Sequence, residues 1–277
     1  MERTIRRAAF PITCIVAGVF AATACSVSQD QEVALGEADA AQIDSQLPIV
    51  HDTMVDRYIS ALGNSMASKT SRADLTWHFA VVNTAEVNAF ALPGGYIFIN
   101  RGAIEQADRM DELAGIMGHE IGHVVRRHAV EQLQKQAKRD VGIIVLCTLT
   151  RICHSIGGQI AVSVSADAMS ARYSQKDEAQ ADSEGVQNTF RAGIDPEGLP
   201  GFFQKLLDEQ KVRPTAFEAF FSTHPTDASR VATTRRLIAT LPAPAHPLVQ
   251  DTPEFHLIQA QVRAWPAPPK DTTATTP

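Results

Sequence analysis

Five residues, His119-Glu120-Ile121-Gly122-His123, constrain this chain more than any other stretch. Read as an α-helix, they place the two histidines four residues apart on one face, where both imidazoles can bind one zinc ion. Glu120 lies about 100° around the helix axis, which suits a base that takes a proton from a water on that ion. The pattern therefore predicts a helix with two metal ligands and a general base. A chance match on an amphipathic helix is the alternative, since short motifs recur by accident.

A third metal ligand has to come from elsewhere, because a catalytic zinc takes three protein ligands and keeps one position open. Glu178 is the candidate, and Asp182 lies one helical turn after it. A carboxylate at that position can accept the second ring N–H of a ligating histidine and so fix its tautomer. Ala179 and Ala181 are small enough to let this helix pack closely on the motif helix. The alternative is a solvated helix face, since acidic residues often begin helices.

The motif helix is expected to begin after Asp108, which is a good N-cap residue. Its apolar stripe includes Leu113, Met117 and Ile121, so the motif histidines lie beside the buried face. His128 would lie on the opposite side of a straight helix from His119. We therefore expect His128 to be structural or exposed rather than a ligand of the same metal.

A small antiparallel sheet is expected ahead of the motif helix. Residues 75–82, 87–92 and 96–99 favour strands, and Pro93-Gly94-Gly95 is typical of a turn. An edge strand in this sheet can bind an extended peptide by strand addition. A purely structural sheet is the alternative.

Four separate motifs, taken together, resemble those of the gluzincin metalloproteases of the Ste24 and HtpX type. The resemblance covers roughly residues 50–240 and is strongest to exported bacterial members such as LoiP and BepA. BepA-like members carry a long helical-repeat domain after the protease, whereas only a short tail follows here, so the lipoprotein LoiP is the nearer likeness. The motifs, in chain order, are Asn88-Ala89-Phe90-Ala91-Leu92-Pro93-Gly94-Gly95, the stretch from His119 to His123, Glu178-Ala179-Gln180-Ala181-Asp182, and Thr223-His224-Pro225 with Arg230.

This resemblance implies an α+β fold, a mainly helical zincin-like metalloprotease domain with a small antiparallel sheet. It also implies that one zinc ion is bound by His119, His123 and Glu178, with Glu120 as the general base. Gln180 departs from the family pattern, because many members have a second glutamate there.

The resemblance assigns further roles around the metal. Asp182 and Arg230 would support the ligands from behind. His224 would lie near the open metal position, where it either stabilises the oxyanion during catalysis or covers the zinc in a resting state. The strand that holds the substrate would contain Asn88, Ala89, Phe90 and Ala91.

The N-terminal residues have the pattern of a secretory signal peptide, with Arg3, Arg6 and Arg7 ahead of an uncharged apolar run that ends near Ala24. The following Cys25-Ser26 resembles a lipoprotein cleavage site, so we expect residues 1–24 to be a lipoprotein-type signal and Cys25 to be lipidated. Lipoprotein sorting patterns then favour the outer membrane, facing the periplasm. A soluble periplasmic protein is the alternative.

The remaining boundaries follow from composition. Residues 25–47 are polar without a strong apolar period, which predicts a flexible tether, and residues 48–242 form the metalloprotease domain. Residues 243–277 are predicted to be a proline-rich tail with one short helix. In an oxidising compartment we expect Cys147 and Cys153 to form a disulfide. They lie within residues 141–164, a largely apolar stretch for which a buried hairpin, a lid and a membrane contact are the alternatives, and we favour a lid held by the cysteine pair.

The formal net charge of −6 and the absence of a basic stripe argue against a nucleic-acid partner. We expect a zinc-dependent metalloendopeptidase of the bacterial cell envelope that degrades misfolded or misassembled envelope proteins. Its expected partners are polypeptide substrates, the lipid bilayer through the anchor, and envelope assembly proteins. The alternatives are a lipid-anchored periplasmic chaperone or assembly factor with a dormant, covered zinc site, and a zinc hydrolase for a small substrate.

Overall fold

The computed structural model describes residues 27–139, 172–213 and 217–268. Several predictions fall outside these residues: the signal peptide, the lipidation site Cys25, the stretch 141–164 and the disulfide between Cys147 and Cys153. The described chain is mainly helical with one small sheet, which confirms the predicted α+β class. Within it, no helix combines the length and apolar character needed to cross a bilayer.

The sheet has four strands in the order β1-β2-β4-β3. They are β1 (Ile49–Val50), β2 (His78–Val82), β3 (Ala89–Leu92) and β4 (Tyr96–Asn100). The expectation of an antiparallel sheet is wrong, because β2 and β4 pair in parallel while the other pairs are antiparallel. After β2 the chain skips one position to form the outermost strand β3. It then turns through η1 (Pro93–Gly95) and inserts β4 between them. This order makes β3 an edge strand.

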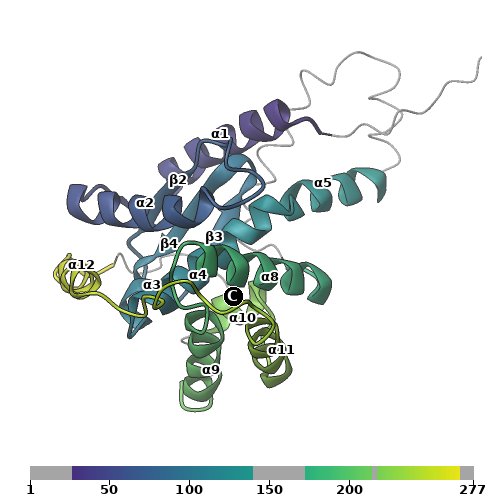
Figure 1. Ribbon diagram of the computed structural model, residues 1–277. Coiled ribbons are helices and arrows are strands. Elements are labelled where there is room, and N and C mark those ends of the chain that lie inside the picture. The colour runs from purple at the N-terminus through teal and green to yellow at the C-terminus, as the bar shows by residue number, and fades with distance from the viewer. Residues whose placement is uncertain (1–26, 140–171, 214–216, 269–277) are drawn as a thin grey trace, which may run out of the picture.

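Helices cover both faces of the sheet (Figure 1). Along β3 the side chains alternate, as expected for a strand buried on both faces. Ala89 and Ala91 belong to the main core with α2 (Thr53–Ala67) and α4 (Met110–Val125), whereas Phe90 and Leu92 pack in a second cluster with Ile43 of α1. The edge strand is therefore held between the N-terminal helix and the motif helix.

The N-terminal segment is not the flexible tether that its composition predicts. Residues Gln29–Gln46 form helix α1, which begins with a capping box between Ser28 and Gln31. Its buried face consists of Glu32, Gly36, Asp39 and Ile43, so it has little apolar character. Instead of apolar side-chain packing, the backbone of α1 lies directly against the backbone of η1. A Cβ added at Gly36 would lie 1.9 Å from the Pro93 carbonyl oxygen. The helix therefore forms against the η1 turn through contacts that a hydrophobic pattern does not reveal.

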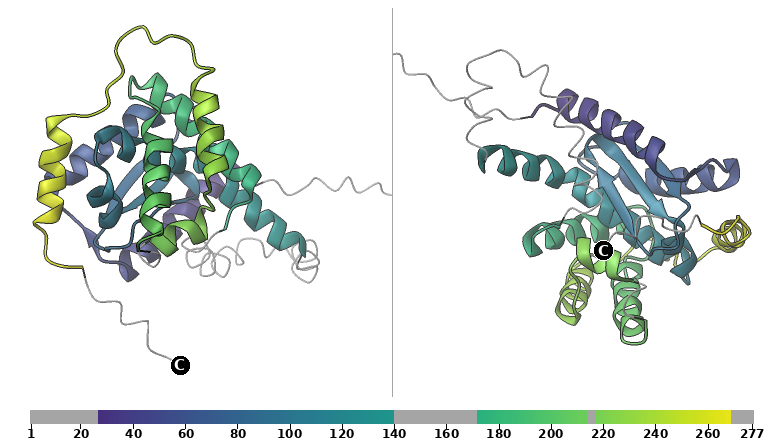
Figure 2. Two further views of the ribbon diagram at one scale, coloured as in Figure 1. Left: turned by 90° about the horizontal axis from the view of Figure 1, so that it is seen from below. Right: turned by 180° about the vertical axis from the view of Figure 1, so that it is seen from behind.

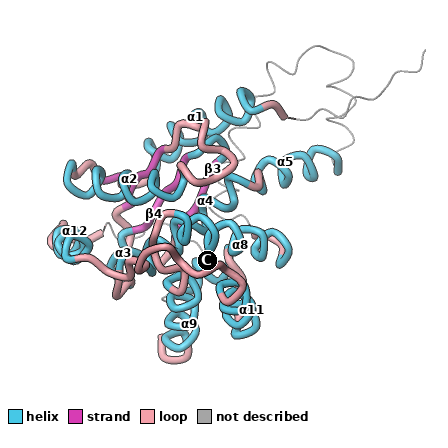
Figure 3. The backbone as a smooth tube through the Cα atoms, in the orientation of Figure 1, coloured by secondary structure: helices cyan, strands magenta, loops and turns pink. Residues whose placement is uncertain are grey.

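A second group of helices lies on the side of the sheet away from α1, as the tube in Figure 3 shows. Helix α4 packs along α8 (Gln175–Arg191) and α9 (Gly198–Gln210), and α11 (Ala228–Ile238) packs on both of these. Short helices α3 (Arg101–Gln106) and α10 (Glu218–Thr223) complete this group.

Two helices lie at opposite ends of the molecule, α5 (His128–Arg139) and α12 (Pro253–Arg263) (Figure 2). Helix α12 is the single short helix expected in the proline-rich tail, and it docks on α3 and α2. Gln259 fixes it there by donating from Nε2 to the carbonyl oxygens of Ile104 and Ala107 at 3.0 and 2.6 Å.

Candidate metal centre

Close packing of α4 on α8 builds the site. A Cβ added at Gly122 would lie 2.7 Å from the Ala181 carbonyl oxygen and 3.0 Å from its Cα, so only glycine allows this approach. Gly118 makes a similar contact with Thr189 one turn earlier. These glycines bring the acidic side chains of α8 against the histidines of α4. The helix begins at Met110 with Arg109 as N-cap, so the expectation that Asp108 caps it is wrong.

Four buried side chains converge between the helices. His119 and His123 from α4, Glu178 from α8 and His224 at the end of α10 each offer one ligand atom, and these atoms lie within 4.8 Å of one another. The Nε2 atoms of His119 and His123 are 3.0 Å apart. His224 Nδ1 lies 3.3 Å from both His119 Nε2 and Glu178 Oε1. All four residues are about 2 % exposed.

This donor set fits a zinc ion. Nitrogen atoms bound to tetrahedral zinc at about 2.0–2.1 Å are roughly 3.3 Å apart, close to the spacing seen here. Glu178 turns one carboxylate oxygen toward each motif histidine, with Oε2 3.5 Å from His119 Nε2 and Oε1 3.5 Å from His123 Nε2. Arg230 Nη1 pairs with Oε2 at 2.5 Å. Facing imidazole nitrogens are costly to bury without a proton or a cation between them. The residues present therefore suit the metal that the sequence predicts.

The electrostatics of the cluster favour a positive charge. Burial opposes ionisation of Glu178, but the charge of His224 and the hydrogen bonds from the surrounding histidines outweigh it and lower the pKa of Glu178. Burial also opposes protonation of His119, yet hydrogen bonds to Asp182 and Glu178 raise the pKa of His119 to about 9. Burial, together with the charges of His119 and His224, holds the pKa of His123 well below its ordinary value, so His123 offers a neutral nitrogen to a metal ion.

The side chains behind His119 hold it in one orientation. Asp182 Oδ1 lies 2.9 Å from His119 Nδ1, which leaves Nε2 directed into the cluster. Arg230 from α11 bonds both oxygens of Asp182. Burial opposes ionisation of Asp182, but the hydrogen bonds from Arg230 and His119 lower its pKa to about 2. Arg230 also pairs with Glu178 through Nη1 at 2.5 Å, so the two residues predicted to support the ligands contact both His119 and Glu178.

Glu120 lies beside the cluster without joining it. Its side chain is buried, and Oε1 is 3.4 Å from His224 Nε2. Burial, the largest influence, raises the pKa of Glu120 above its ordinary value. A carboxyl group with a raised pKa and a place next to a metal site is suited to accept and return a proton.

His128 is not remote from the metal site, contrary to the expectation from a straight helix. Helix α4 ends at Val125, and Arg127 has a left-handed backbone with φ of 59°. This turn starts α5 in a new direction and brings the buried His128 back to His123, with their Nδ1 atoms 3.0 Å apart. Periodicity could not reveal this contact, since it depends on one unusual backbone angle.

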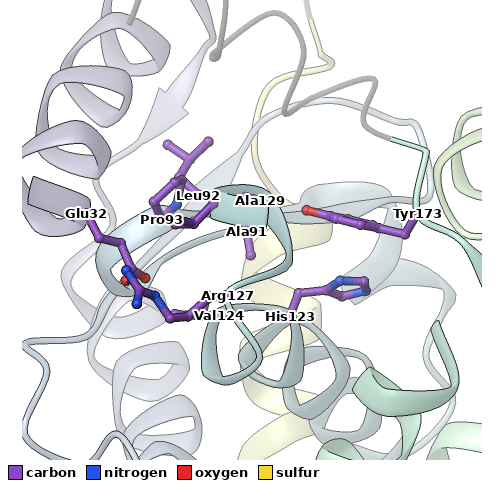
Figure 4. Close-up of a pocket in the computed structure, with 10 residues that line it drawn as sticks. Glu32, Ala91, Leu92, Pro93, His123, Val124, Arg127, Ala129 and Tyr173 are labelled. Atoms are coloured by element: carbon purple, nitrogen blue, oxygen red, sulfur yellow. The ribbon is translucent and has the colours of Figure 1, made fainter. Parts of the chain in front are cut away.

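Tyr173 is a second neighbour that the sequence did not indicate. Its ring centroid lies 4.0 Å from that of His123, at an interplanar angle of 31°. With Ala91, Leu92 and Pro93 these two residues line a small cavity (Figure 4). Its volume is about 10 Å³, enough for one water molecule.

The predicted substrate strand lies next to this cavity. Ala89, Phe90 and Ala91 are in the edge strand β3, and Asn88 immediately precedes it. Ala91 lines the cavity, whereas Phe90 belongs to the cluster on the α1 side. The strand edge and the histidine cluster are thus neighbours in space.

Comparison with known proteins gives a consistent match. Residues 54–238 match the family described as Peptidase family M48. The chain is 30% identical over 216 residues to the beta-barrel assembly-enhancing protease of Yersinia pestis, covering 76% of this chain and 44% of that one. It is 30% identical over 243 residues to the protein of that name from Escherichia coli K12, covering 85% and 49%.

A mitochondrial protein matches a shorter part of the chain. The mitochondrial metalloendopeptidase OMA1 of Bos taurus is 29% identical over 173 residues, covering 60% of this chain and 33% of that one. The chain therefore spans about half the length, or less, of the curated relatives it matches.

Proposed function

Because the chain belongs to Peptidase family M48, we propose that it is a zinc-dependent metalloendopeptidase whose metal is held by His119, His123 and Glu178. The observation that carries this proposal is the convergence of their ligand atoms within 4.8 Å, with the buried carboxyl of Glu120 beside them.

The chain's own residues divide the work of hydrolysis. When bound, zinc supplies a Lewis acid that activates a water and polarises the scissile carbonyl. Glu120 takes the proton of the attacking water on its carboxylate and passes it to the leaving amine. Asp182 holds the ring of His119 through Nδ1, and Arg230 holds Asp182, so the ligand does not turn away during the reaction.

The edge strand β3 is the proposed binding place for the substrate. Among the described residues β3 pairs with β4 alone, and its other edge is where an extended peptide would add as a further strand. Ala89, Phe90 and Ala91 would form this ladder, with Asn88 at its end. Hydrogen bonds between the backbone of β3 and the backbone of a substrate do not depend on the substrate's side chains. Such binding therefore suits polypeptides of varied sequence.

The arrangement of His224 corresponds to a closed state. Its Nδ1 lies 3.3 Å from His119 Nε2 and Glu178 Oε1, in the place of a fourth ligand. A catalytic zinc needs that position for water and substrate. We therefore assign His224 a covering role in this state, and the loop after α10 must move for catalysis.

The proposed setting is the bacterial cell envelope. Its support is the name of the bacterial relatives, together with the predicted signal peptide and lipidation at Cys25. The enzyme would face the periplasm from the outer membrane and cleave misfolded or misassembled envelope proteins, in contact with envelope assembly proteins.

The test compares full-length protein with its E120Q variant in cleavage of casein and of an unfolded outer-membrane protein. We expect zinc-dependent cleavage by the wild type, loss on chelation, and loss in E120Q with zinc still bound. Zinc-loaded wild type that cleaves neither substrate, even with His224→Ala, would favour the chaperone function instead. Mass spectrometry of the mature N-terminus tests the anchor, and an unmodified Cys25 would exclude it.

A further inference from the structure

We infer that His128 and Gln180 form a hydrogen-bond relay that fixes the tautomer and orientation of His123, as Asp182 and Arg230 do for His119. The inference rests on the proposed function, since it takes His123 as a zinc ligand. It adds two positioning residues, neither of which touches the metal or the substrate.

The contacts run in a line from α4 to α8. His123 Nδ1 lies 3.0 Å from His128 Nδ1, and His128 Nε2 lies 3.1 Å from Gln180 Oε1. Both histidines are 2 % exposed, so bulk solvent does not compete for these contacts. The two rings meet edge to face, with centroids 5.0 Å apart and an interplanar angle of 74°.

When His123 binds a metal, only one placement of the ring protons allows both hydrogen bonds, from His123 to His128 and from His128 to Gln180. His123 directs Nε2 into the cluster, 3.0 Å from His119 Nε2, so this nitrogen must be unprotonated. The proton of neutral His123 is then on Nδ1 and is donated to His128 Nδ1. His128 must in turn carry its proton on Nε2 and donate it to the Gln180 amide oxygen. Each atom in the line has a partner of the opposite kind.

Two further residues keep His128 in place. Asp177 Oδ1 lies 3.9 Å from His128 Nε2, and its negative charge favours a proton on that nitrogen. Arg127, whose left-handed backbone redirects the chain, donates from Nη2 to the Val27 carbonyl oxygen at 2.6 Å and pairs through Nε with Glu32 at 2.7 Å. The turn that positions His128 is thus fixed by Glu32 of helix α1 and by Val27, which lies two residues before that helix.

Helix α8 therefore serves the metal site in three ways. Glu178 supplies a ligand atom, Asp182 supports His119, and Gln180 supports His123 through His128. A glutamate at position 180 would also present an acceptor oxygen to His128 Nε2, so the relay requires an acceptor and not an amide as such.

The test measures the zinc dissociation constant by chelator competition in full-length protein with E120Q, which prevents self-cleavage. His128→Leu keeps much of the volume but removes the acceptor, and we expect about 10- to 100-fold weaker zinc binding. His128→Asn places an amide oxygen near the lost Nδ1, so binding should return close to the parent value. Gln180→Leu should weaken binding, and Gln180→Glu should preserve it. His256→Leu removes an exposed histidine paired with Asp251 and is the matched control.

A second readout separates positioning from packing. In ¹⁵N-histidine spectra of the metal-free protein, His123 should carry its proton on Nδ1 in the parent and lose that preference in His128→Leu. Thermal unfolding of the metal-free variants shows whether they fold. Equal zinc affinity and an unchanged His123 tautomer in folded His128→Leu would overturn the relay while leaving the metal site intact. A parent protein that binds no zinc would instead overturn the metal site itself, and the relay with it.

Discussion

Arg230 bonds both carboxylate oxygens of Asp182, with Nη2 2.7 Å from Oδ1 and Nε 2.8 Å from Oδ2. Asp182 Oδ1 also contacts His119 Nδ1 at 2.9 Å. Three helices that are distant in sequence, α11, α8 and α4, thus meet at one buried carboxylate. The planar fork of arginine matches this geometry, and lysine cannot reproduce it.

Removing this guanidinium should be costly. Arg230→Ala leaves Asp182 charged and buried without its strongest partner, so we expect the free energy of unfolding to fall by about 3–5 kcal/mol. Arg235→Ala on the same helix is the control, because its ion pair with Glu197 is largely exposed and should contribute less than about 1 kcal/mol. Denaturant unfolding measures both. Equal losses in the two variants would contradict the importance assigned to the buried pair.

The approach of α4 to α8 predicts a second effect. Gly122→Ala places a methyl group against the Ala181 backbone and should push α8 away, at a cost of about 1–3 kcal/mol. Zinc content should fall as well, since Glu178 moves with α8. Gly201→Ala is the control, because nothing lies within 4 Å of its added Cβ and helix propensity favours alanine by about 0.5–1 kcal/mol. Unfolding curves and metal analysis test the pair, and a harmless Gly122→Ala would show that the helices can adjust.

His224 gives a prediction about regulation. If it covers the metal, His224→Ala should raise kcat/KM on a fluorogenic peptide severalfold, because the fourth position becomes free for water. His51→Ala replaces an exposed histidine and should leave the rate unchanged. Decreased activity with zinc retained would instead assign His224 to stabilising the oxyanion.

Sequence alone predicted the class of enzyme and its metal. Family membership confirms the resemblance drawn from four motifs. These features are local. His119 and His123 lie four residues apart, and Glu178 and Asp182 lie four residues apart, so each pair can be recognised within a short stretch of sequence. The strands at 78–82, 89–92 and 96–100 and the tail helix also lie close to where their patterns predicted them.

Features that depend on distant partners could not be predicted. The parallel pairing of β2 with β4 follows from the order of strands, which no short stretch encodes. Helix α1 buries Glu32, Gly36 and Asp39 instead of an apolar stripe, so its pattern resembled a tether. His128 reaches His123 through the single left-handed residue Arg127. In each case the decisive contact is long-range or depends on one backbone angle.

Helix α1 is joined to the body by a buried ion pair. Glu32 is fully buried and bonds Arg72 through both oxygens, at 2.6 and 3.1 Å, while Arg72 also donates to the Val124 carbonyl oxygen at the end of α4. Glu32→Gln leaves Arg72 charged and buried, and should lower the free energy of unfolding by about 3–5 kcal/mol. Asp30→Asn, exposed on the same helix, should change it by less than about 0.5 kcal/mol. Chemical denaturation compares them, and similar small effects in both variants would mean that the Glu32–Arg72 pair does not stabilise the fold.

Asp39 makes the stability of the protein depend on pH. Both carboxylate oxygens are buried without a hydrogen-bond partner among the described residues, and burial raises the pKa of Asp39 to about 7 from 3.8. Between these values the unfolded chain loses the proton while the folded protein keeps it, so stability falls as pH rises from about 4 to 7. Above pH 7 Asp39 is ionised in the folded protein as well, and burying this charge lowers the free energy of unfolding by on the order of 4 kcal/mol, at about 1.4 kcal/mol per pKa unit.

Asp39→Asn removes this titration while keeping the side chain's size. Near pH 4 the variant and the wild type should have the same free energy of unfolding. Between pH 4 and pH 7 the variant should become increasingly more stable than the wild type, and above pH 7 the difference should stay constant. Asp44→Asn, exposed on the same helix, should differ from the wild type by the same small amount at every pH. Urea unfolding at pH 4, 5.5, 7 and 8 gives the comparison. A difference between Asp39→Asn and wild type that does not grow with pH would mean that the folded protein solvates or pairs this carboxylate.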